Sequence, residues 1–212
     1  MTKIYLISPP KIELSEFSKS LSKALKTSLV PVFQLRLKGY SKQELEKISL
    51  ELKKICHDNN SIFLLNDNYE IALNVNADGV HLGLEDGSIK KARQESLKNN
   101  KDFIIGASCY DSKHLAMEAG EQGVDYISFG TFFPSKTKNS IGKPTTEILE
   151  WSNELLNLPI VAIGGINHEN CEPLVKAGTD FLAVISYVWE NSEGEDKALK
   201  KLNEVIRKFS EK

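Results

Sequence analysis

Paired cysteines are absent from this chain of 212 residues. Its three cysteines, Cys56, Cys109 and Cys171, are scattered and form no C-x-x-C pair. A disulfide framework or a zinc site would need an even or closely spaced set. We therefore expect reduced thiols, as in a cytoplasmic protein, and no disulfide or zinc site.

Long apolar runs and an excess of charge are also absent. The longest apolar runs, such as PIVAIGGI, are as short as strands and cannot cross a bilayer. The formal net charge of −2 argues against broad attraction to nucleic acid or to an anionic membrane. Met1 leads directly into KIYLIS, without a signal-peptide core. We expect a cytoplasmic protein with neither nucleic-acid nor membrane partners.

The sequence instead contains eight short apolar runs. They begin near residues 3, 31, 61, 77, 102, 124, 159 and 180. Most are rich in Ile, Val, Phe or Leu, as strands buried on both faces are. Helix-like segments lie between them, and one opens with Ser41 and Glu44 at the spacing of a capping box.

Eight strand–helix units predict an α/β protein with a (β/α)8 TIM barrel, forming a single compact domain over residues 1–212. An open Rossmann-type sheet is the alternative. That alternative is weaker because no G-x-G-x-x-G opens a helix after an early strand.

Polar residues gather where the second strand ends. Gln34, Arg36 and Lys38 alternate with Leu35 and Leu37. A period of two places the three polar side chains on one face of the strand and the leucines on the other. Chemistry in these barrels lies at the carboxyl ends of the strands. We therefore expect an amide and two cations to face the barrel mouth, although a strand end fraying into solvent would look similar.

Carboxylates follow the third and fourth strands. Asn66 and Asp67 end one run, and Glu85 and Asp86 follow the next. Asp67 and Asp86 can both reach one metal ion, because their strands are neighbours. Two carboxylates with substrate phosphates are a typical Mg²⁺ site. Each pair alone is more often turn chemistry, but together they favour a metal.

Small and hydroxylated residues follow the last four strands. Gly164 and Gly165 allow backbone N–H groups to approach a ligand after the seventh strand. Ser186 ends the eighth, and the loops after strands seven and eight are the recurrent phosphate site of such barrels. Ser108 ends the fifth strand and can face inward.

The stretch FFPSKTK follows the sixth strand and carries hydroxyls and cations on a loop. Ser135 and Thr137 can bond a phosphate, and Lys138 can reach an anion nearer the second strand. Three cations, with Mg²⁺, outweigh the two carboxylates, so the mouth suits a pyrophosphate beside a separate phosphate. A pyrophosphate held in this way is also a good leaving group.

The chain closely resembles the thiamine phosphate synthase family. The matching pieces are QLRLK, LLNDN, ADGVHLGLED, IGAS, FFPSKTK, IVAIGGI and AVIS, in the family's order over about residues 4 to 188. The resemblance implies a (β/α)8 barrel. It implies a transferase of thiamine biosynthesis that joins 4-amino-5-hydroxymethyl-2-methylpyrimidine pyrophosphate to thiazole phosphate. Pyrophosphate leaves first in that mechanism, and the thiazole nitrogen captures a pyrimidine carbocation.

The resemblance also assigns roles to residues. It places Gln34 beside the pyrimidine, Ser108 beside the reacting centre, and Asp67 and Asp86 on Mg²⁺. The pyrimidine pyrophosphate is held by Arg36, Lys38, Asn66 and Lys138. The thiazole phosphate is held by Ser135, Thr137, Gly165, Ile185 and Ser186. The catalytic group comprises Arg36, Lys38, Ser108 and Lys138. A homodimer is expected from the family alone.

The sequence departs from the family's pattern in several places. Leu84 stands where Gln is usual, Ser135 replaces Thr, and Cys109-Tyr110 replaces a small residue and His. The usual segment before the first strand is also absent. The Leu84 and Cys109-Tyr110 changes put the fine substrate preference in question.

Two other functions remain as alternatives. A thiazole tautomerase of the same superfamily would use a His where Tyr110 stands and would lack the Ser/Thr-x-Thr-Lys loop. A non-catalytic thiamine-phosphate-binding protein would need no metal carboxylates. We expect His81 to be a packed residue of the barrel rather than a catalyst.

Overall fold

The eight apolar runs form eight parallel strands that close into one barrel, in the order β1 to β8. The computed structural model describes residues 1–83, 87–98, 102–134 and 142–210. The strands are β1 Lys3–Ile7, β2 Val32–Leu35, β3 Ile62–Asn66, β4 Gly79–Leu82, β5 Ile104–Tyr110, β6 Tyr126–Gly130, β7 Ile160–Ile163 and β8 Phe181–Val184. Each strand pairs with its neighbours in sequence, and β1 also pairs with β8. The predicted TIM barrel is confirmed.

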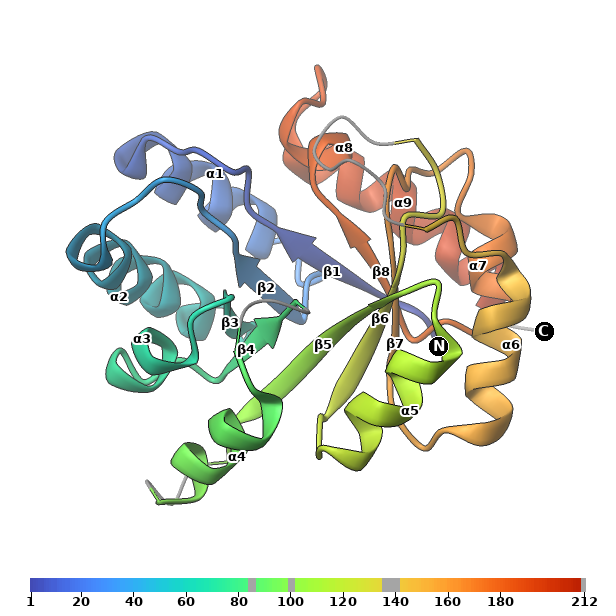
Figure 1. Ribbon diagram of the computed structural model, residues 1–212. Helices are drawn as coiled ribbons and strands as arrows, with labels where there is room; N and C mark the ends of the chain where they lie inside the picture. The colour runs from blue at the N-terminus through green and yellow to red at the C-terminus, as the bar shows by residue number, and fades with distance from the viewer. Residues whose placement is uncertain (84–86, 99–101, 135–141, 211–212) are drawn as a thin grey trace.

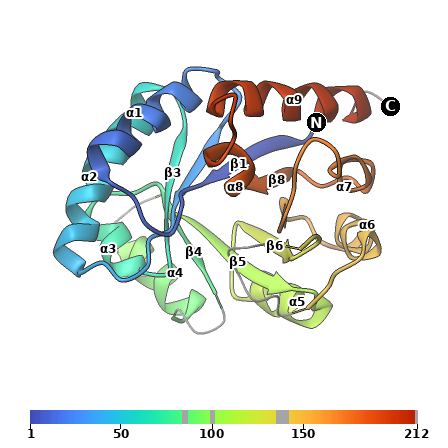
Figure 2. The ribbon, with the colours of Figure 1, turned by 90° about the horizontal axis from the view of Figure 1, so that it is seen from above.

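Helices surround the barrel, as Figure 1 shows. They are α1 Leu14–Leu25, α2 Lys42–Asp58, α3 Tyr69–Asn74, α4 Ile89–Lys98, α5 Lys113–Glu121, α6 Thr146–Leu155, α7 Glu172–Lys176, α8 Ser186–Trp189 and α9 Glu195–Ser210. Figure 2 shows the start of α9 next to the end of α1, where Lys23 pairs with Glu195 and Asp196. The last helix also contacts β1, which pairs with β8. No helix in the described part of the chain is long and apolar enough to span a membrane.

Local signals explain where the helices begin and end. The predicted capping box is present at α2, where Ser41 and Glu44 each accept the other's backbone N–H. Helices α5 and α7 are each followed by a glycine with positive φ, Gly123 at 87° and Gly178 at 83°. Glycine adopts that left-handed conformation at the lowest cost, because it has no side chain.

The core has two layers. The larger one lies between the strands and the helices and includes Leu6, Phe33 and Ile105. The smaller one fills the barrel interior and includes Tyr5 and Tyr126. Successive residues of a strand face opposite layers, which is why Tyr5 points inward while Leu6 points outward.

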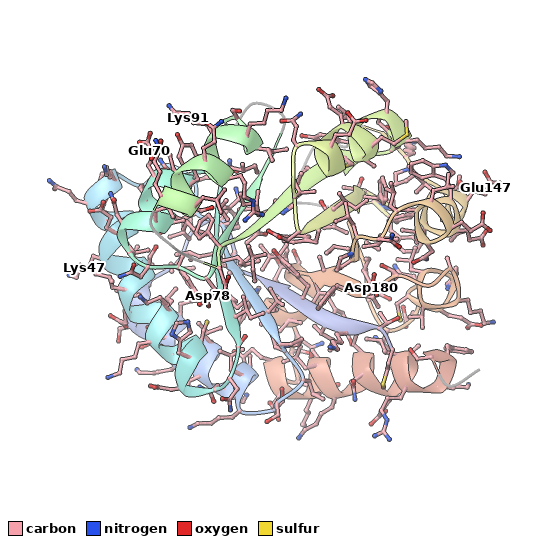
Figure 3. All side chains as sticks on the ribbon, turned by 90° about the horizontal axis from the view of Figure 1, so that it is seen from below. Lys47, Glu70, Asp78, Lys91, Glu147 and Asp180 are labelled. Carbon is pink, nitrogen blue, oxygen red and sulfur yellow. The ribbon has the colours of Figure 1, made fainter. Side chains whose placement is uncertain are left out.

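An aspartate precedes each of β4, β6 and β8 and binds the start of the preceding strand. These residues are Asp78, Asp125 and Asp180, and Figure 3 labels the first and third. Their carboxylates accept backbone N–H groups at 2.7, 2.7 and 2.8 Å from Phe63, Ile105 and Ile160, respectively. They lie at the amino ends of the strands, where polar residues serve stability rather than chemistry.

Candidate active site

A cavity of about 750 Å³ opens at the carboxyl ends of the strands, and every strand contributes to its wall. It gathers all the predicted site residues that the structure describes. These are Gln34, Arg36, Lys38, Asn66, Asp67, Ser108, Gly165, Ile185 and Ser186. The other predicted site residues, Asp86, Ser135, Thr137 and Lys138, lie outside the described residues, as does Leu84.

The alternation predicted after β2 continues beyond the end of that strand. Leu35 is fully buried and Leu37 packs against the outer core, while Arg36 and Lys38 line the cavity. The backbone N–H of Arg36 donates to Ser8 Oγ at 2.8 Å, and that of Lys38 donates to Pro10 O at 3.0 Å. The loop after β1 therefore keeps this segment extended, so that both cations face the mouth.

The two cations differ in what they contact. Lys38 Nζ lies 3.0 Å from Asp67 Oδ2 in an ion pair at the cavity mouth. The guanidinium of Arg36 has no hydrogen bond or ion pair with any residue in the described ranges. Arg36 thus brings five N–H donors to the cavity that a planar anion can use.

Amide and carboxylate groups join across β2 and β3. Gln34, which is almost fully buried, donates from Nε2 to Asn66 Oδ1 at 3.1 Å. Asn66 Nδ2 in turn donates to Asp67 Oδ1. The backbone N–H of Asp67 donates to His81 O at 2.8 Å, which ties β3 to β4. This network fixes the Asp67 carboxylate at the cavity mouth.

The metal prediction can be tested against the donor set. No cluster of three or more His, Cys, Asp or Glu side chains within the described ranges could hold an ion by itself. Asp67 supplies a hard carboxylate at a mouth that also holds two cations suited to phosphate. Mg²⁺ commonly takes one or two carboxylates and completes its shell with phosphate oxygens and water. The Asp67 carboxylate therefore suits Mg²⁺ as a ligand. The second predicted ligand, Asp86, lies outside the described residues.

The opposite wall is made of backbone from the ends of β6, β7 and β8. The N–H groups of Phe132 and Phe133 donate to the carbonyls of Ile163 and Gly164 at 3.1 Å each. This pairing brings the segment after β6 so close to Gly165 that a Cβ there would lie 2.3 Å from Pro134 O. The short helix α8 begins at Ser186, directly after β8 and Ile185. A short extra helix after the last strand is the usual phosphate-binding element of these barrels.

Replacing Gly165 with alanine is expected to lower the free energy of unfolding by about 2–4 kcal/mol. The residue has a φ of 61°, and its new methyl group would collide with backbone rather than with a side chain that could move. Urea denaturation of the variant and the native protein measures the difference.

Gly123→Ala is the matched control for that experiment. Gly123 has a φ of 87°, but a methyl group there would meet nothing within 4 Å apart from its own chain neighbours. It should therefore lose only the conformational part, about 1 kcal/mol. Equal losses in the two variants would contradict the close contact between Gly165 and Pro134.

Three side chains that the sequence analysis did not single out for the site are linked to Ser108, directly or one through another. His81 Nε2 lies 2.9 Å from Ser108 Oγ, and His81 Nδ1 lies 2.8 Å from the Tyr126 hydroxyl. Tyr126 also contacts the Tyr5 hydroxyl at 2.8 Å. The period-two alternation of β1, β4 and β6 was the signal that could have placed all three inside the barrel.

Cys109 follows Ser108 but does not face the cavity. It is fully buried in the outer core, and burial raises the pKa of its thiol to about 12. A thiol that stays protonated is a poor nucleophile. The preceding and following residues, Ser108 and Tyr110, line the cavity instead.

Comparisons with known proteins agree with this geometry. A family model described as thiamine monophosphate synthase matches residues 4–188. A thiamine-phosphate synthase of Erythrobacter litoralis is 44% identical over 196 residues, which cover 91% of this chain and 90% of that protein. Another, from Rhodospirillum centenum, is 40% identical over 205 residues and covers 97% of this chain and 98% of its own.

Comparison with solved structures supports both the family and the fold. Thiamine phosphate pyrophosphorylase from Pyrococcus furiosus superposes with a TM-score of 0.83 at 33% identity, covering 98% of this chain and 96% of that one. A 3-hexulose-6-phosphate synthase from Salmonella typhimurium has a TM-score of 0.72 at 14% identity, covering 97% of this chain and 99% of its own, so it shares only the fold. On the family match and these relatives together, the chain belongs to the thiamine monophosphate synthase family.

Proposed function

We propose that this chain, a transferase of thiamine biosynthesis, joins 4-amino-5-hydroxymethyl-2-methylpyrimidine pyrophosphate to thiazole phosphate in the cavity at the barrel mouth. The observation that carries the proposal is the arrangement of its walls. Arg36 and Lys38 lie on the β2 side, whereas Gly165, Ile185 and Ser186 lie after β7 and β8. Two separate anion-binding walls suit two anionic substrates held side by side.

The β2 and β3 wall is assigned to the pyrimidine pyrophosphate. Arg36 offers the pyrophosphate guanidinium donors that no residue in the described ranges uses, with Lys38, Asn66 and Lys138 as the other predicted contacts. Gln34 donates a hydrogen bond to Asn66, and its proposed place is beside the pyrimidine ring. Charge-assisted hydrogen bonds to phosphate oxygens are among the strongest that side chains make.

The wall after β7 and β8 is assigned to the thiazole phosphate. Backbone N–H groups at Gly165, Ile185 and Ser186 would bind it, because Gly165 has no side chain to block the approach. Ser135 and Thr137 are the predicted hydroxyl contacts from the loop after β6. Ser108 lies between the two walls, beside the reacting atoms.

Bond breaking and bond making are proposed to occur in succession. The bond from the pyrimidine methylene carbon to the pyrophosphate oxygen breaks, and its electron pair leaves with the pyrophosphate. The thiazole nitrogen then donates its lone pair to that carbon and forms the new C–N bond. Arg36, Lys38 and Lys138 stabilise the charge that grows on the leaving group, which is where preformed donors accelerate a reaction most.

Magnesium is part of the proposal. Asp67 and Asp86 would hold Mg²⁺, which supplies further positive charge against the pyrophosphate oxygens. The ion pair between Lys38 and Asp67 keeps a carboxylate and a cation together at that place. The pyrophosphate could therefore contact Mg²⁺ and the cationic side chains at the same wall of the cavity.

Residues 1–212 are proposed to act as a single domain in the cytoplasm. All eight strands belong to one closed barrel, and the three cysteines are free and buried. Small molecules are the substrates of this family. The homodimer remains a prediction.

Product formation tests the proposed function. The purified protein is incubated with the pyrimidine pyrophosphate, thiazole phosphate and Mg²⁺, and thiamine phosphate is quantified by mass spectrometry. Product should require both substrates and should appear with one equivalent of pyrophosphate. Tight binding of thiamine phosphate that ignores Mg²⁺, without any turnover, would instead identify a non-catalytic binding protein.

A further inference from the structure

Four hydroxyl and imidazole groups form a continuous chain from the barrel interior to the cavity. It runs from Tyr5 on β1 to Tyr126 on β6, then to His81 on β4 and Ser108 on β5. The three contacts measure 2.8, 2.8 and 2.9 Å in that order. Tyr5 and Tyr126 are 3% and 6% exposed, while Ser108 reaches the cavity. All four residues line the cavity, so the chain of contacts runs along its wall, with the two tyrosines almost fully buried.

Both tyrosine hydroxyls stay protonated. Burial raises the pKa of both phenols well above the ordinary value, so each keeps its O–H at physiological pH. Neutral imidazole has one donor nitrogen and one acceptor nitrogen. The direction in which the hydrogen bonds donate along these four groups therefore depends on which hydroxyl has a single partner.

Tyr5 is the member that sets the direction. Tyr126 is the only hydrogen-bond partner of the Tyr5 hydroxyl among the residues that the structure describes. A buried O–H without an acceptor is costly, which favours the arrangement in which Tyr5 donates to Tyr126. Tyr126 then donates to His81 Nδ1, and His81 Nε2–H donates to Ser108 Oγ.

We propose that His81 is a positioning residue, which accepts from Tyr126 and donates to Ser108 so that the Ser108 O–H points to the substrate. The inference rests on the proposed function, in which Ser108 lies beside the reacting atoms. In the opposite direction Ser108 would donate to His81, and its proton would be turned away from the cavity. The rings of His81 and Tyr126 also contact each other, with centroids 5.5 Å apart and an angle of 28° between their planes.

Two tyrosine variants separate this role from simple packing. Tyr126→Phe removes the O–H that donates to His81 Nδ1, so the inferred direction is no longer favoured, and kcat should fall about tenfold. Tyr5→Phe removes a hydroxyl from the same chain, but Tyr126 still has to donate to His81. Its kcat should fall only about twofold. KM for both substrates should be similar in the two variants, whereas the melting temperature should be lower in Tyr126→Phe, which leaves the buried Tyr5 O–H without its acceptor.

A double variant tests whether the effect passes through Ser108. Tyr126→Phe should cost nothing further once Ser108→Ala has removed the hydroxyl that it orients. Losses that multiply in the double variant, or equal losses in Tyr126→Phe and Tyr5→Phe, would overturn the proposal. His81→Gln, whose amide can still donate toward Ser108, should retain more of kcat than His81→Leu.

The tautomer of His81 gives a readout that does not depend on catalysis or on any variant folding. Imidazole ¹⁵N chemical shifts of the native protein should report a proton on Nε2 and none on Nδ1. A proton on Nδ1 alone would overturn the proposal even if the kinetics agreed. If the native protein makes no thiamine phosphate, the proposed function fails, whereas the tautomer still shows whether the chain runs in the inferred direction.

Discussion

Arg36→Met is expected to lower kcat for thiamine phosphate formation by about 10²- to 10³-fold, the usual cost of removing one preorganised donor from a developing charge. Methionine keeps an unbranched apolar stem, but it lacks the guanidinium group with its charge and all five donors. The backbone position should not change, because the N–H of residue 36, not its side chain, donates to Ser8. The loss therefore measures what the guanidinium does for the leaving pyrophosphate.

Two further variants make the Arg36 experiment specific. Arg36→Lys keeps the charge but not the planar fork, so its kcat should lie between those of the native enzyme and Arg36→Met. Arg207→Met on α9 removes an exposed arginine that does not line the cavity and should leave kcat unchanged. If kcat is retained in Arg36→Met, with only KM for the pyrimidine pyrophosphate raised, Arg36 binds ground state and transition state equally, contrary to the proposal.

The barrel could be predicted because its local signals agree with one another. Strand-sized apolar runs recur eight times, and a helix signal such as the capping box at Ser41 and Glu44 lies between two of them. Parallel strands leave few ways to bury such runs on both faces. Since the carboxyl ends of the strands meet at one mouth, residues as distant in sequence as Arg36 and Ser186 could be placed together without a structure.

Contacts between side chains could not be predicted from these local signals. His81 was expected to be a packing residue, because a single histidine in an apolar strand carries no signal of its partners. Its link to Ser108 and Tyr126 depends on the register of β4, β5 and β6, which the closed barrel sets. The ion pair between Lys38 and Asp67 likewise depends on how the segment after β2 is held by the loop after β1.

Asp67→Asn is expected to lower kcat by at least about a hundredfold at a fixed, low Mg²⁺ concentration, because loss of a metal-binding group costs at least what loss of a supporting partner does. The substitution changes charge with almost no change in shape. Asp67 has a φ of 70°, and asparagine tolerates this left-handed conformation well. Its backbone N–H can still donate to His81 O, so the melting temperature should change little.

The dependence of kcat on Mg²⁺ concentration decides between two roles for this carboxylate. If Asp67 holds the ion, raising Mg²⁺ should restore part of the activity of Asp67→Asn, and the half-maximal concentration should rise. If Asp67 only positions Lys38, through their contact of 3.0 Å, the half-maximal concentration should stay native and Lys38→Met should reproduce the defect. Asp58→Asn at the exposed end of α2 controls for the change in net charge. A native half-maximal concentration in Asp67→Asn would therefore remove Asp67 from the metal site while leaving the cationic wall of Arg36 and Lys38 intact.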